Sequence, residues 1–240
     1  MNTVSLPYPK PLMIAHRGLS GIEKENTCSA FVAAGNRSYF GIETDVHRTA
    51  DGQFIVIHDD DTLRVSGDRM TVEETSMETL RSLRLTDTDG RRGRRDLMLP
   101  TLEEYIGICA KYGKTAVLEL KNHMDGRDVE AVVRSIRELG WLERTVFISF
   151  DLPNLISLRE LLPAQKAQYL IEEHVPADLM DTLARWRLDL DIHHPMLTAE
   201  MCRKIHAMGL EVNVWTVNTP EDARRVTEAG ADYITTNILE

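Results

Sequence analysis

The regular alternation of short apolar runs with segments of helical period is the feature that most constrains the fold of this chain. The apolar runs lie at residues 12–16, 41–46, 53–59, 115–121, 145–150, 167–171, 188–194, 211–217 and 232–237. Between most of them lie stretches that open on Thr or Asp and end on Gly, as capped helices do. Strands that alternate with helices form parallel βα units, so the sequence predicts an α/β fold.

The nine apolar runs are one more than an eight-stranded barrel needs. Runs 41–46 and 53–59 are separated by only a few residues, among them the turn signal "ADG", whereas a parallel crossover needs about a dozen. We therefore expect these two runs to form an antiparallel hairpin, which leaves eight parallel strands for a (β/α)8 TIM barrel. If the turn centres on Ala50 and Asp51, Glu43 lies opposite His58, with both side chains on one face.

Residues 60 to about 99 interrupt the alternation of strands and helices. We expect a short helical insertion after the second strand, over one mouth of the barrel, with a helix at 71–85 that begins in a capping box of Thr71 and Glu74. The loop "GRRGRR" at 90–95 is typical of a solvated surface, and its alternative role is to steer an anionic substrate or a lipid headgroup. We expect residues 1–240 to form a single domain, because α/β barrels commonly reach this length undivided.

The charge balance excludes several classes of partner. A formal net charge of −10 argues against general binding to nucleic acid or to anionic membranes. Apolar runs all fall well short of the roughly 18 residues that a membrane span needs, and the N-terminal residues lack the apolar segment of a signal peptide. The three cysteines have no spacing typical of a disulfide framework or a zinc site. We predict a cytoplasmic protein without stable membrane insertion, of unspecified oligomeric state.

Charged and polar side chains gather at the ends of the predicted strands. They are His16 and Arg17 in "AHRG", Glu43 and Asp45 in "ETD", His58 in "VIHD", and Glu119 and Lys121 in "LELK". In an α/β barrel the carboxyl ends of the strands form the active-site face, so we expect these groups to converge. Carboxylates suit Mg²⁺ or Ca²⁺, Arg and Lys suit phosphate oxygens, and histidines suit proton transfer near neutral pH. The set indicates phosphodiester chemistry with one divalent cation.

The motifs also resemble those of the glycerophosphodiester phosphodiesterases, in the same order from Met13 to Asn237. They read "AHRG", "ENTCSAF", "ETDVHRTADGQFIVIHDD", "PTLEE", "LELK", "VNVWTVN" and "DYITTN". The resemblance implies a metal-dependent (β/α)8 hydrolase that splits glycerophosphodiesters into sn-glycerol 3-phosphate and an alcohol. It also implies a role for each site residue: metal ligands Glu43, Asp45 and Glu119, acid and base His16 and His58, phosphate contacts Arg17 and Lys121, and Trp215 as a pocket wall.

Several alternatives stay open at the level of sequence. The nucleophile is either water or the glycerol 2-hydroxyl, and either histidine can act first. Around Glu25 and Asn26, the residues either provide an ordinary helix cap at Asn26 or Thr27 or support the metal or a histidine. "RVSG" at 64–67 stands where many relatives have "RTT", which leaves the preferred alcohol undefined. The same barrel could serve a lysophospholipase D or a phosphodiester-cleaving lyase, or could bind phosphodiesters without catalysis.

Overall fold

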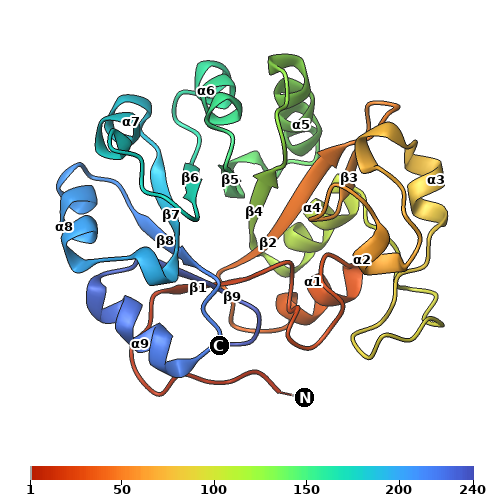
Figure 1. Cartoon of the computed structure of the whole chain (residues 1–240), viewed down its shortest axis with the longest axis horizontal. Coiled ribbons are helices and arrows are strands. Elements are labelled where there is room, and N and C mark those ends of the chain that lie inside the picture. Colours follow the sequence, from red (N-terminus) through yellow and green to blue (C-terminus); the bar gives the residue numbers. More distant parts are fainter. Residues whose placement is uncertain (1) are drawn as a thin grey trace.

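The computed structural model describes residues 2–240, in which nine strands form one sheet (Figure 1). The strands are β1 (Leu12–Ala15), β2 (Gly41–Arg48), β3 (Phe54–Val56), β4 (Thr115–Leu120), β5 (Thr145–Ser149), β6 (Ala167–Ile171), β7 (Asp189–His193), β8 (Val212–Trp215) and β9 (Tyr233–Thr236). All except β3 run parallel, and β1 pairs with both β2 and β9, which closes the barrel. The predicted TIM barrel is therefore confirmed.

The helices surround the barrel on its outside (Figure 1). The α-helices are α1 (Cys28–Gly35), α2 (Leu63–Ser66), α3 (Met77–Ser82), α4 (Leu102–Tyr112), α5 (Gly126–Glu138), α6 (Leu152–Leu161), α7 (Leu179–Trp186), α8 (Ala199–Ala207) and α9 (Pro220–Ala229), and the 3₁₀ helices are η1 (Val72–Glu74), η2 (Leu142–Arg144) and η3 (His194–Met196). Thr27, Thr101, Thr198 and Thr219 cap α1, α4, α8 and α9 through their hydroxyls. Over residues 2–240, none of the helices combines the length and apolarity that crossing a membrane requires.

The hairpin of β2 and β3 forms as predicted, but its register differs by one residue. Val46 pairs with Val56, and the Thr49 N–H donates to the Gln53 carbonyl at 2.8 Å. The loop therefore has three residues and ends on Gly52 at φ +76°, the left-handed conformation typical of such loops. The expectation that Glu43 pairs with His58 is wrong. Strand pairing stops at Val56, and the following residues carry His58 into the central pocket.

The predicted helical insertion after the second strand contains α2, η1 and α3, but the expected single helix at 71–85 is wrong. Thr75 adopts extended backbone angles, and its carbonyl accepts a hydrogen bond from Ala50 in the hairpin loop at 3.1 Å. A new helix, α3, begins after Ser76, whose hydroxyl caps it. The Thr71 side chain makes no capping hydrogen bond. This break allows Val72 and Met77 to enter the same small apolar cluster, which a continuous helix would separate.

The basic loop at 90–95 is largely exposed, as predicted. Its Arg94 is an exception, because the guanidinium forms ion pairs with Glu23 at 2.8 Å and Asp96 at 2.7 Å. Arg92 contacts Asp68 at 3.1 Å. Part of the loop's positive charge is thus neutralised locally, which weakens the alternative role in substrate steering.

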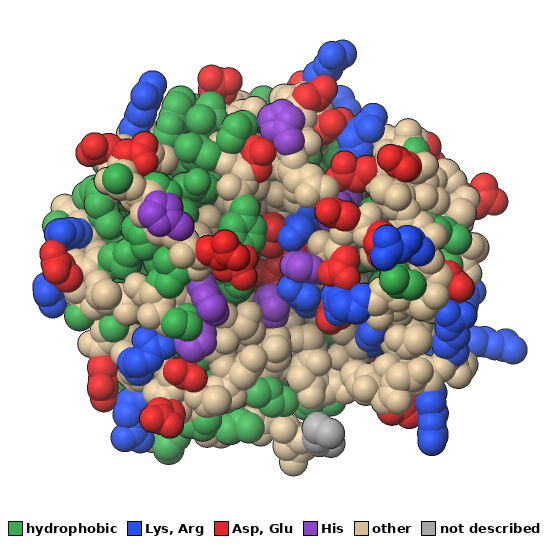
Figure 2. Space-filling view, viewed as in Figure 1, with side chains coloured by type: hydrophobic (Ala, Val, Ile, Leu, Met, Phe, Trp, Pro, Cys, Tyr) green, Lys and Arg blue, Asp and Glu red, His purple; other side chains and the backbone are tan. Residues whose placement is uncertain are grey.

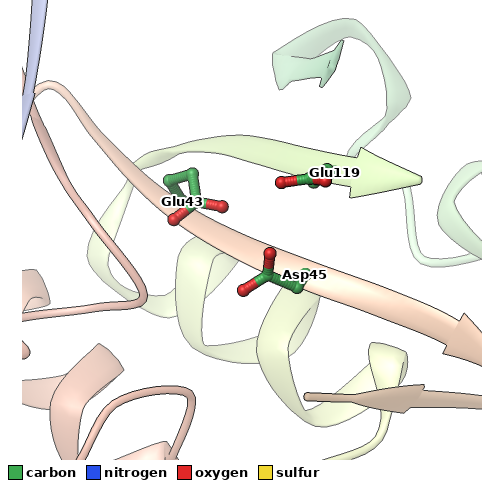
Figure 3. Close-up of side chains that lie close together, drawn as sticks. All are labelled: Glu43, Asp45 and Glu119. Atoms are coloured by element: carbon green, nitrogen blue, oxygen red, sulfur yellow. The ribbon is translucent and has the colours of Figure 1, made fainter. Parts of the chain in front are cut away.

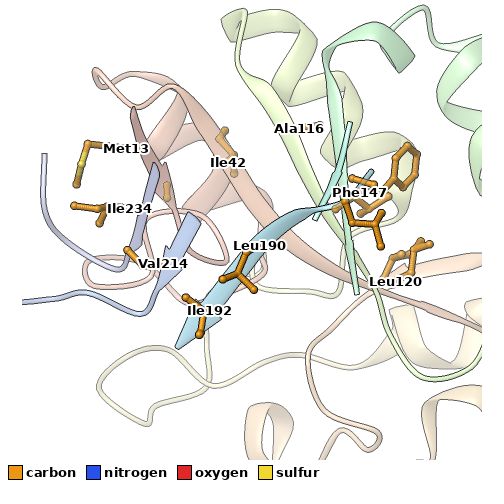
Figure 4. Close-up of a cluster of buried hydrophobic side chains, with 14 of the residues drawn as sticks. Met13, Ile42, Ala116, Leu120, Phe147, Leu190, Ile192, Val214 and Ile234 are labelled. Carbon is orange, nitrogen blue, oxygen red and sulfur yellow. The ribbon is translucent and has the colours of Figure 1, made fainter. Parts of the chain in front are cut away.

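Two apolar layers stabilise the barrel, because side chains alternate between the two faces of each strand. On the outer face, residues such as Ile42, Phe147 and Ile192 are fully buried in the core cluster shown in Figure 4. On the inner face, Val117 and Leu170 belong to a smaller cluster. The next inward-facing position along β4 is Glu119, so the barrel interior changes from apolar to charged toward the carboxyl ends of the strands.

Gly18 shows why the first motif ends in glycine. Its φ is +74°, and an added Cβ would lie 2.7 Å from the Ala30 carbonyl carbon. We expect Gly18→Ala to lower the free energy of unfolding by about 1–3 kcal/mol, measured by urea denaturation. Gly90→Ala is the matched control, since Gly90 has φ +80° with nothing within 4 Å of the added Cβ. Equal losses in the two variants would contradict the steric explanation.

Candidate active site

A pocket opens at the centre of the barrel face, where histidine, basic and acidic side chains gather around a hollow (Figure 2). Its lining residues are His16, Arg17, Glu43, His58, Glu119, Ile148, Phe150, Leu170, Glu172, Asp191, Trp215 and Thr235. Six of the eight residues predicted for the site are among them. Of the other two, Asp45 is buried next to Glu43 and Glu119, and Lys121 lines an adjoining pocket that shares Glu119 and Phe150.

Three buried carboxylates converge from neighbouring strands. Glu43 and Asp45 share the inward face of β2, and Asp45 is the register partner of Glu119 on β4. One oxygen from each carboxylate lies within 4.8 Å of the other two. Figure 3 shows the three side chains approaching one another from these two strands. Hard oxygen donors at this separation are the ligand type that Mg²⁺ and Ca²⁺ prefer.

Two of the three carboxyls in this cluster resist ionisation. Burial, followed by the charge of Asp45, raises the pKa of both Glu43 and Glu119 above the ordinary glutamate value. Burial opposes ionisation of Asp45 as well, but Arg17, His58 and Lys121 hold the Asp45 pKa below its usual range. One ionised carboxylate between two that resist ionisation is an arrangement that a bound divalent cation would stabilise. The donor set therefore fits one Mg²⁺ or Ca²⁺ ion.

Arg17 and Lys121 place two positive charges beside the carboxylates. Lys121 Nζ lies 2.9 Å from Glu119 Oε1 and 3.8 Å from Asp45 Oδ1. Arg17 has φ +53°, and its backbone N–H donates to Glu43 Oε2 at 2.7 Å. Its Nε is 3.6 Å from Asp45 Oδ2 and, although buried, has no hydrogen-bond acceptor. A buried donor without a partner suits an incoming anion such as a phosphoryl oxygen.

His16 presents an unprotonated nitrogen to the pocket. Its Nδ1 lies 2.7 Å from Asn237 Oδ1, which also accepts a hydrogen bond from the Ser20 hydroxyl at 2.9 Å. Because this oxygen is an acceptor, Nδ1 carries the proton and Nε2 keeps its lone pair. Burial, followed by the charge of Arg17, lowers the pKa of His16 to about 4. The imidazole is therefore neutral near pH 7 and can accept a proton.

His58 has a different environment, because its ring donates to a carboxylate. Nδ1 lies 2.8 Å from Asp59 Oδ1. Burial lowers the pKa of His58, and the charges of Arg17 and Lys121 act in the same direction. The Asp45 charge and the hydrogen bond to Asp59 oppose this lowering in part. His47 on β2 contacts the His58 backbone, with its Nε2 3.3 Å from the His58 carbonyl oxygen.

Asn26 and Glu25 support the site rather than cap the first helix. Thr27 caps α1. Asn26 donates to Asp45 Oδ2 at 2.7 Å and accepts from the Thr44 hydroxyl at 2.7 Å. Glu25 accepts a hydrogen bond from Arg17 Nη1 at 2.9 Å. These contacts fix the orientation of the Asp45 carboxylate and of the Arg17 guanidinium.

The side of the pocket formed by β5, β6 and β8 is mainly apolar. The Trp215 ring lies 5.7 Å from the Phe150 ring and 5.4 Å from the His193 ring, centroid to centroid. Sequence reasoning did not select Phe150, Glu172 or Asp191, which also line the pocket. The period of two along strand 188–194 could have identified Asp191, because it faces inward together with His193.

The whole of this site falls within the region that matches a family model. Residues 16–240 match the model described as the glycerophosphoryl diester phosphodiesterase family. The chain belongs to this family. All eight residues predicted for the site lie within the matched range. The resemblance in the sequence motifs is thereby confirmed, and with it membership of a family of phosphodiester hydrolases.

Similarity to individual members of the glycerophosphodiester phosphodiesterase family extends along nearly the full chain. The glycerophosphodiester phosphodiesterase of Caldanaerobacter subterraneus is 28% identical over 240 residues, covering 95% of this chain and 94% of the relative. Human glycerophosphodiester phosphodiesterase 1 is 25% identical, covering 98% and 80%. The structure of an Oleispira antarctica phosphodiesterase in complex with the product sn-glycerol-3-phosphate has a TM-score of 0.86 and 26% identity, with 95% and 93% coverage. The glycerophosphodiester phosphodiesterase of Thermotoga maritima has a TM-score of 0.76 and 25% identity, with 96% coverage of both chains.

The carboxylate cluster predicts a pH-dependent stabilisation by metal. The folded-state pKa of Glu119 is raised from 4.5 to about 8, so without metal its ionisation destabilises the folded state as pH rises through this window. At pH 5 a cation must displace the Glu119 proton, whereas at pH 8 about half of the Glu119 carboxyls are already ionised, so fewer protons oppose binding. We expect the increase in melting temperature on adding Mg²⁺ or Ca²⁺ to grow from pH 5 to pH 8, with NaCl at matched ionic strength as the control. A shift independent of pH would contradict the proposed ligands.

Proposed function

We propose that this protein hydrolyses small glycerophosphodiesters to sn-glycerol 3-phosphate and an alcohol, with one divalent cation held by Glu43, Asp45 and Glu119. The observation that carries this proposal is the meeting, at one pocket, of the buried carboxylates with Arg17 and two histidines. The product complex of the Oleispira relative, which shares the fold at a TM-score of 0.86, supports sn-glycerol 3-phosphate as the product.

In this proposal Arg17 and Lys121 bind the phosphodiester group. The unpartnered Nε of Arg17 donates to one phosphoryl oxygen, and the Lys121 ammonium turns from Glu119 toward another. When bound, a divalent cation would supply charge stabilisation for a phosphoryl oxygen as negative charge develops there. The two side chains hold the phosphorus atom in one orientation relative to the histidines, which favours in-line displacement.

His16 is assigned as the base and His58 as the acid. His16 Nε2 removes a proton from the nucleophile, which is water or the glycerol 2-hydroxyl, as the nucleophile attacks phosphorus. The bond between phosphorus and the alcohol oxygen then breaks, and His58 transfers its Nε2 proton to that oxygen. Attack by water gives sn-glycerol 3-phosphate directly, whereas attack by the 2-hydroxyl gives a cyclic phosphate, which a water molecule then opens to sn-glycerol 3-phosphate. The difference in environment supports this assignment. The pKa of both histidines is lowered by burial, but the His58 ring contacts the Asp59 carboxylate, which opposes this lowering, whereas the His16 ring contacts the neutral Asn237 amide and its pKa falls to about 4.

The size of the pocket favours a small substrate. The pocket volume is about 210 Å³, below the roughly 300–1,000 Å³ of pockets that enclose drug-sized ligands. We assign Trp215 as an apolar wall against the carbon atoms of the glycerol or the alcohol. A deacylated phospholipid such as glycerophosphocholine or glycerophosphoethanolamine suits this volume better than an intact lipid does.

A panel of substrates tests this function. Glycerophosphocholine, glycerophosphoethanolamine and lysophosphatidylcholine are incubated with the enzyme and Mg²⁺ or Ca²⁺, and the phosphorus-containing products are resolved by ³¹P NMR. We expect sn-glycerol 3-phosphate from the first two. Phe150, a 40% exposed aromatic residue at the pocket, favours lysophospholipase D as the second candidate. Lysophosphatidic acid as the dominant product would support that candidate instead.

A further inference from the structure

Arg64 in the insertion connects two acidic residues that each hold a group of the proposed active site. Its Nε and Nη2 donate to Asp59 Oδ2 and Oδ1 at 2.6 and 2.9 Å. Its Nη1 and Nη2 donate to Glu25 Oε2 and Oε1, both at 2.8 Å. One guanidinium therefore binds two carboxylates through paired hydrogen bonds, and Nη2 is shared between them.

The two oxygens that Nη2 joins are the same two that contact the proposed catalytic groups. Asp59 Oδ1 accepts from His58 Nδ1 at 2.8 Å, and Glu25 Oε1 accepts from Arg17 Nη1 at 2.9 Å. His58 and Arg17 both line the pocket. A continuous chain of hydrogen bonds thus runs from His58 through Asp59, Arg64 and Glu25 to Arg17.

The geometry points to Arg64 as a positioning residue, which fixes the His58 imidazole through Asp59 and the Arg17 guanidinium through Glu25. This inference rests on the proposed function, because it assigns proton transfer to His58 and phosphate binding to Arg17. Asp59 and Glu25 would otherwise present two neighbouring negative charges that repel each other. With Arg64 between them, both carboxylates keep the orientation in which they accept hydrogen bonds from the two pocket residues.

The backbone next to Arg64 is held in place by packing and hydrogen bonding, although the Arg64 side chain is 47% exposed. The neighbouring Val65 is buried in the apolar cluster of the insertion, and its carbonyl accepts a hydrogen bond from the Thr86 N–H at 2.9 Å. Exposed ion pairs contribute only about 0–1 kcal/mol to stability. We therefore expect the loss of Arg64 to affect the geometry of the site far more than the stability of the fold.

Lysine cannot replace this arginine, although it keeps the positive charge. Its three N–H donors radiate from a single nitrogen, whereas the planar guanidinium offers separate nitrogens that match the oxygens of two carboxylates. Arg64→Lys therefore removes the paired hydrogen bonds to Asp59 and Glu25 and keeps the positive charge. Arg81→Lys is the matched control, because Arg81, also in the insertion, makes a paired contact with Glu104 at 2.5 and 2.9 Å, and neither residue lines the pocket.

The test compares Arg64→Lys, Asp59→Asn, Glu25→Gln and Arg81→Lys in the metal-loaded enzyme with glycerophosphocholine as substrate. We expect Asp59→Asn to lower kcat about 10- to 100-fold with little change in KM, since it weakens the contact that orients His58 while Arg64 keeps its hydrogen bonds to Glu25. Glu25→Gln should mainly raise KM, because it frees Arg17. Arg64→Lys should change both constants, with a melting temperature within about 3 °C of wild type. Arg81→Lys should keep wild-type kinetics.

A double variant provides a second criterion. If Arg64 acts on His58 through Asp59, then Arg64→Lys combined with Asp59→Asn should lower kcat no further than Asp59→Asn alone. Additive losses would contradict action through Asp59. Wild-type kinetics in Arg64→Lys would overturn the inference, as would a loss of activity equal to that in Arg81→Lys.

A binding measurement separates failure of this inference from failure of the proposed function. Calorimetric titration with sn-glycerol 3-phosphate reports on Arg17 without turnover. We expect Arg64→Lys to weaken this binding about 5- to 20-fold, which corresponds to a loss of about 1–2 kcal/mol in binding free energy. If wild type hydrolysed no glycerophosphodiester but the variant showed this weakening, the proposed function would fall and the link from Arg64 to Arg17 would stand. Equal affinities in wild type and variant would overturn that link.

Discussion

Replacing His16 by alanine is expected to lower kcat by about 10²- to 10⁴-fold, the range typical of a lost general base. The buried imidazole is neutral near pH 7, and its Nδ1 hydrogen bond to Asn237 leaves Nε2 free to accept a proton. Alanine offers no group that can replace this nitrogen. KM should change much less than kcat, because phosphate binding is assigned to Arg17 and Lys121. Steady-state kinetics with glycerophosphocholine and added Mg²⁺ or Ca²⁺ give both constants.

The control for this variant is His206→Ala, which removes a surface histidine paired with Asp232. It should keep wild-type kinetics. The melting temperature of His16→Ala shows whether the loss of the Asn237 contact disturbs the fold. A folded His16→Ala enzyme with more than about one tenth of wild-type kcat would mean that the base lies elsewhere in the pocket.

Replacing Glu43 by glutamine is expected to change activity and stability in opposite directions. Glutamine keeps an oxygen that can accept the Arg17 N–H, which contacts Glu43 Oε2 at 2.7 Å. It removes a carboxyl whose pKa is raised by burial and by the charge of Asp45. We expect the metal-free variant to be more stable than metal-free wild type at pH 8, because the folded state no longer contains this unfavourable ionisation. Activity should fall at least about 100-fold, because a proposed metal ligand is lost.

Thermal denaturation with and without added cation and kinetic assays measure both effects. Asp189→Asn is the matched control, because Asp189 is also mostly buried, with a pKa raised by burial, but lies at the opposite end of the barrel in a separate pocket. It should keep both activity and stabilisation by metal. A Glu43→Gln protein that responds to metal as wild type does would contradict the role of Glu43 as a ligand.

The barrel could be predicted from the sequence because its determinants are local. Each strand is a short apolar run, and Thr residues such as Thr101 and Thr219 mark the starts of helices by capping them. The few residues between runs 41–46 and 53–59 require a hairpin, which reduces nine candidate strands to eight parallel ones. These features depend on spacing and on capping chemistry, which a sequence displays directly.

The register of the hairpin and the helices of the insertion could not be predicted in the same way. The turn signal "ADG" is compatible with a loop of two or three residues, and the choice shifts every pair by one position. Thr71 and Glu74 fit a capping box, but Thr75 instead bonds to Ala50 of the hairpin loop. Each outcome depends on a tertiary contact that overrides a local preference.

The candidate site likewise contains contacts that the strand pattern predicts and contacts that depend on tertiary folding. Glu43, Asp45 and Glu119 could be expected to converge, because inward-facing positions at the ends of adjacent parallel strands lie close together. The contacts of Arg64 with Glu25 and of Asn237 with His16 span 39 and 221 residues. No periodicity indicates such pairs, since they depend on how the insertion and the final loop fold back onto the mouth of the barrel.

The most direct test of the proposed chemistry is the release of sn-glycerol 3-phosphate from glycerophosphocholine, measured with wild type before and after chelation and with His16→Ala. We predict that chelation stops release by wild type and that Mg²⁺ or Ca²⁺ restores it. His16→Ala should release little product either before or after chelation. Hydrolysis that continues after metal analysis shows complete removal of divalent cations would contradict the proposed role of the carboxylate cluster. A His16→Ala enzyme as active as wild type would contradict the assignment of the base.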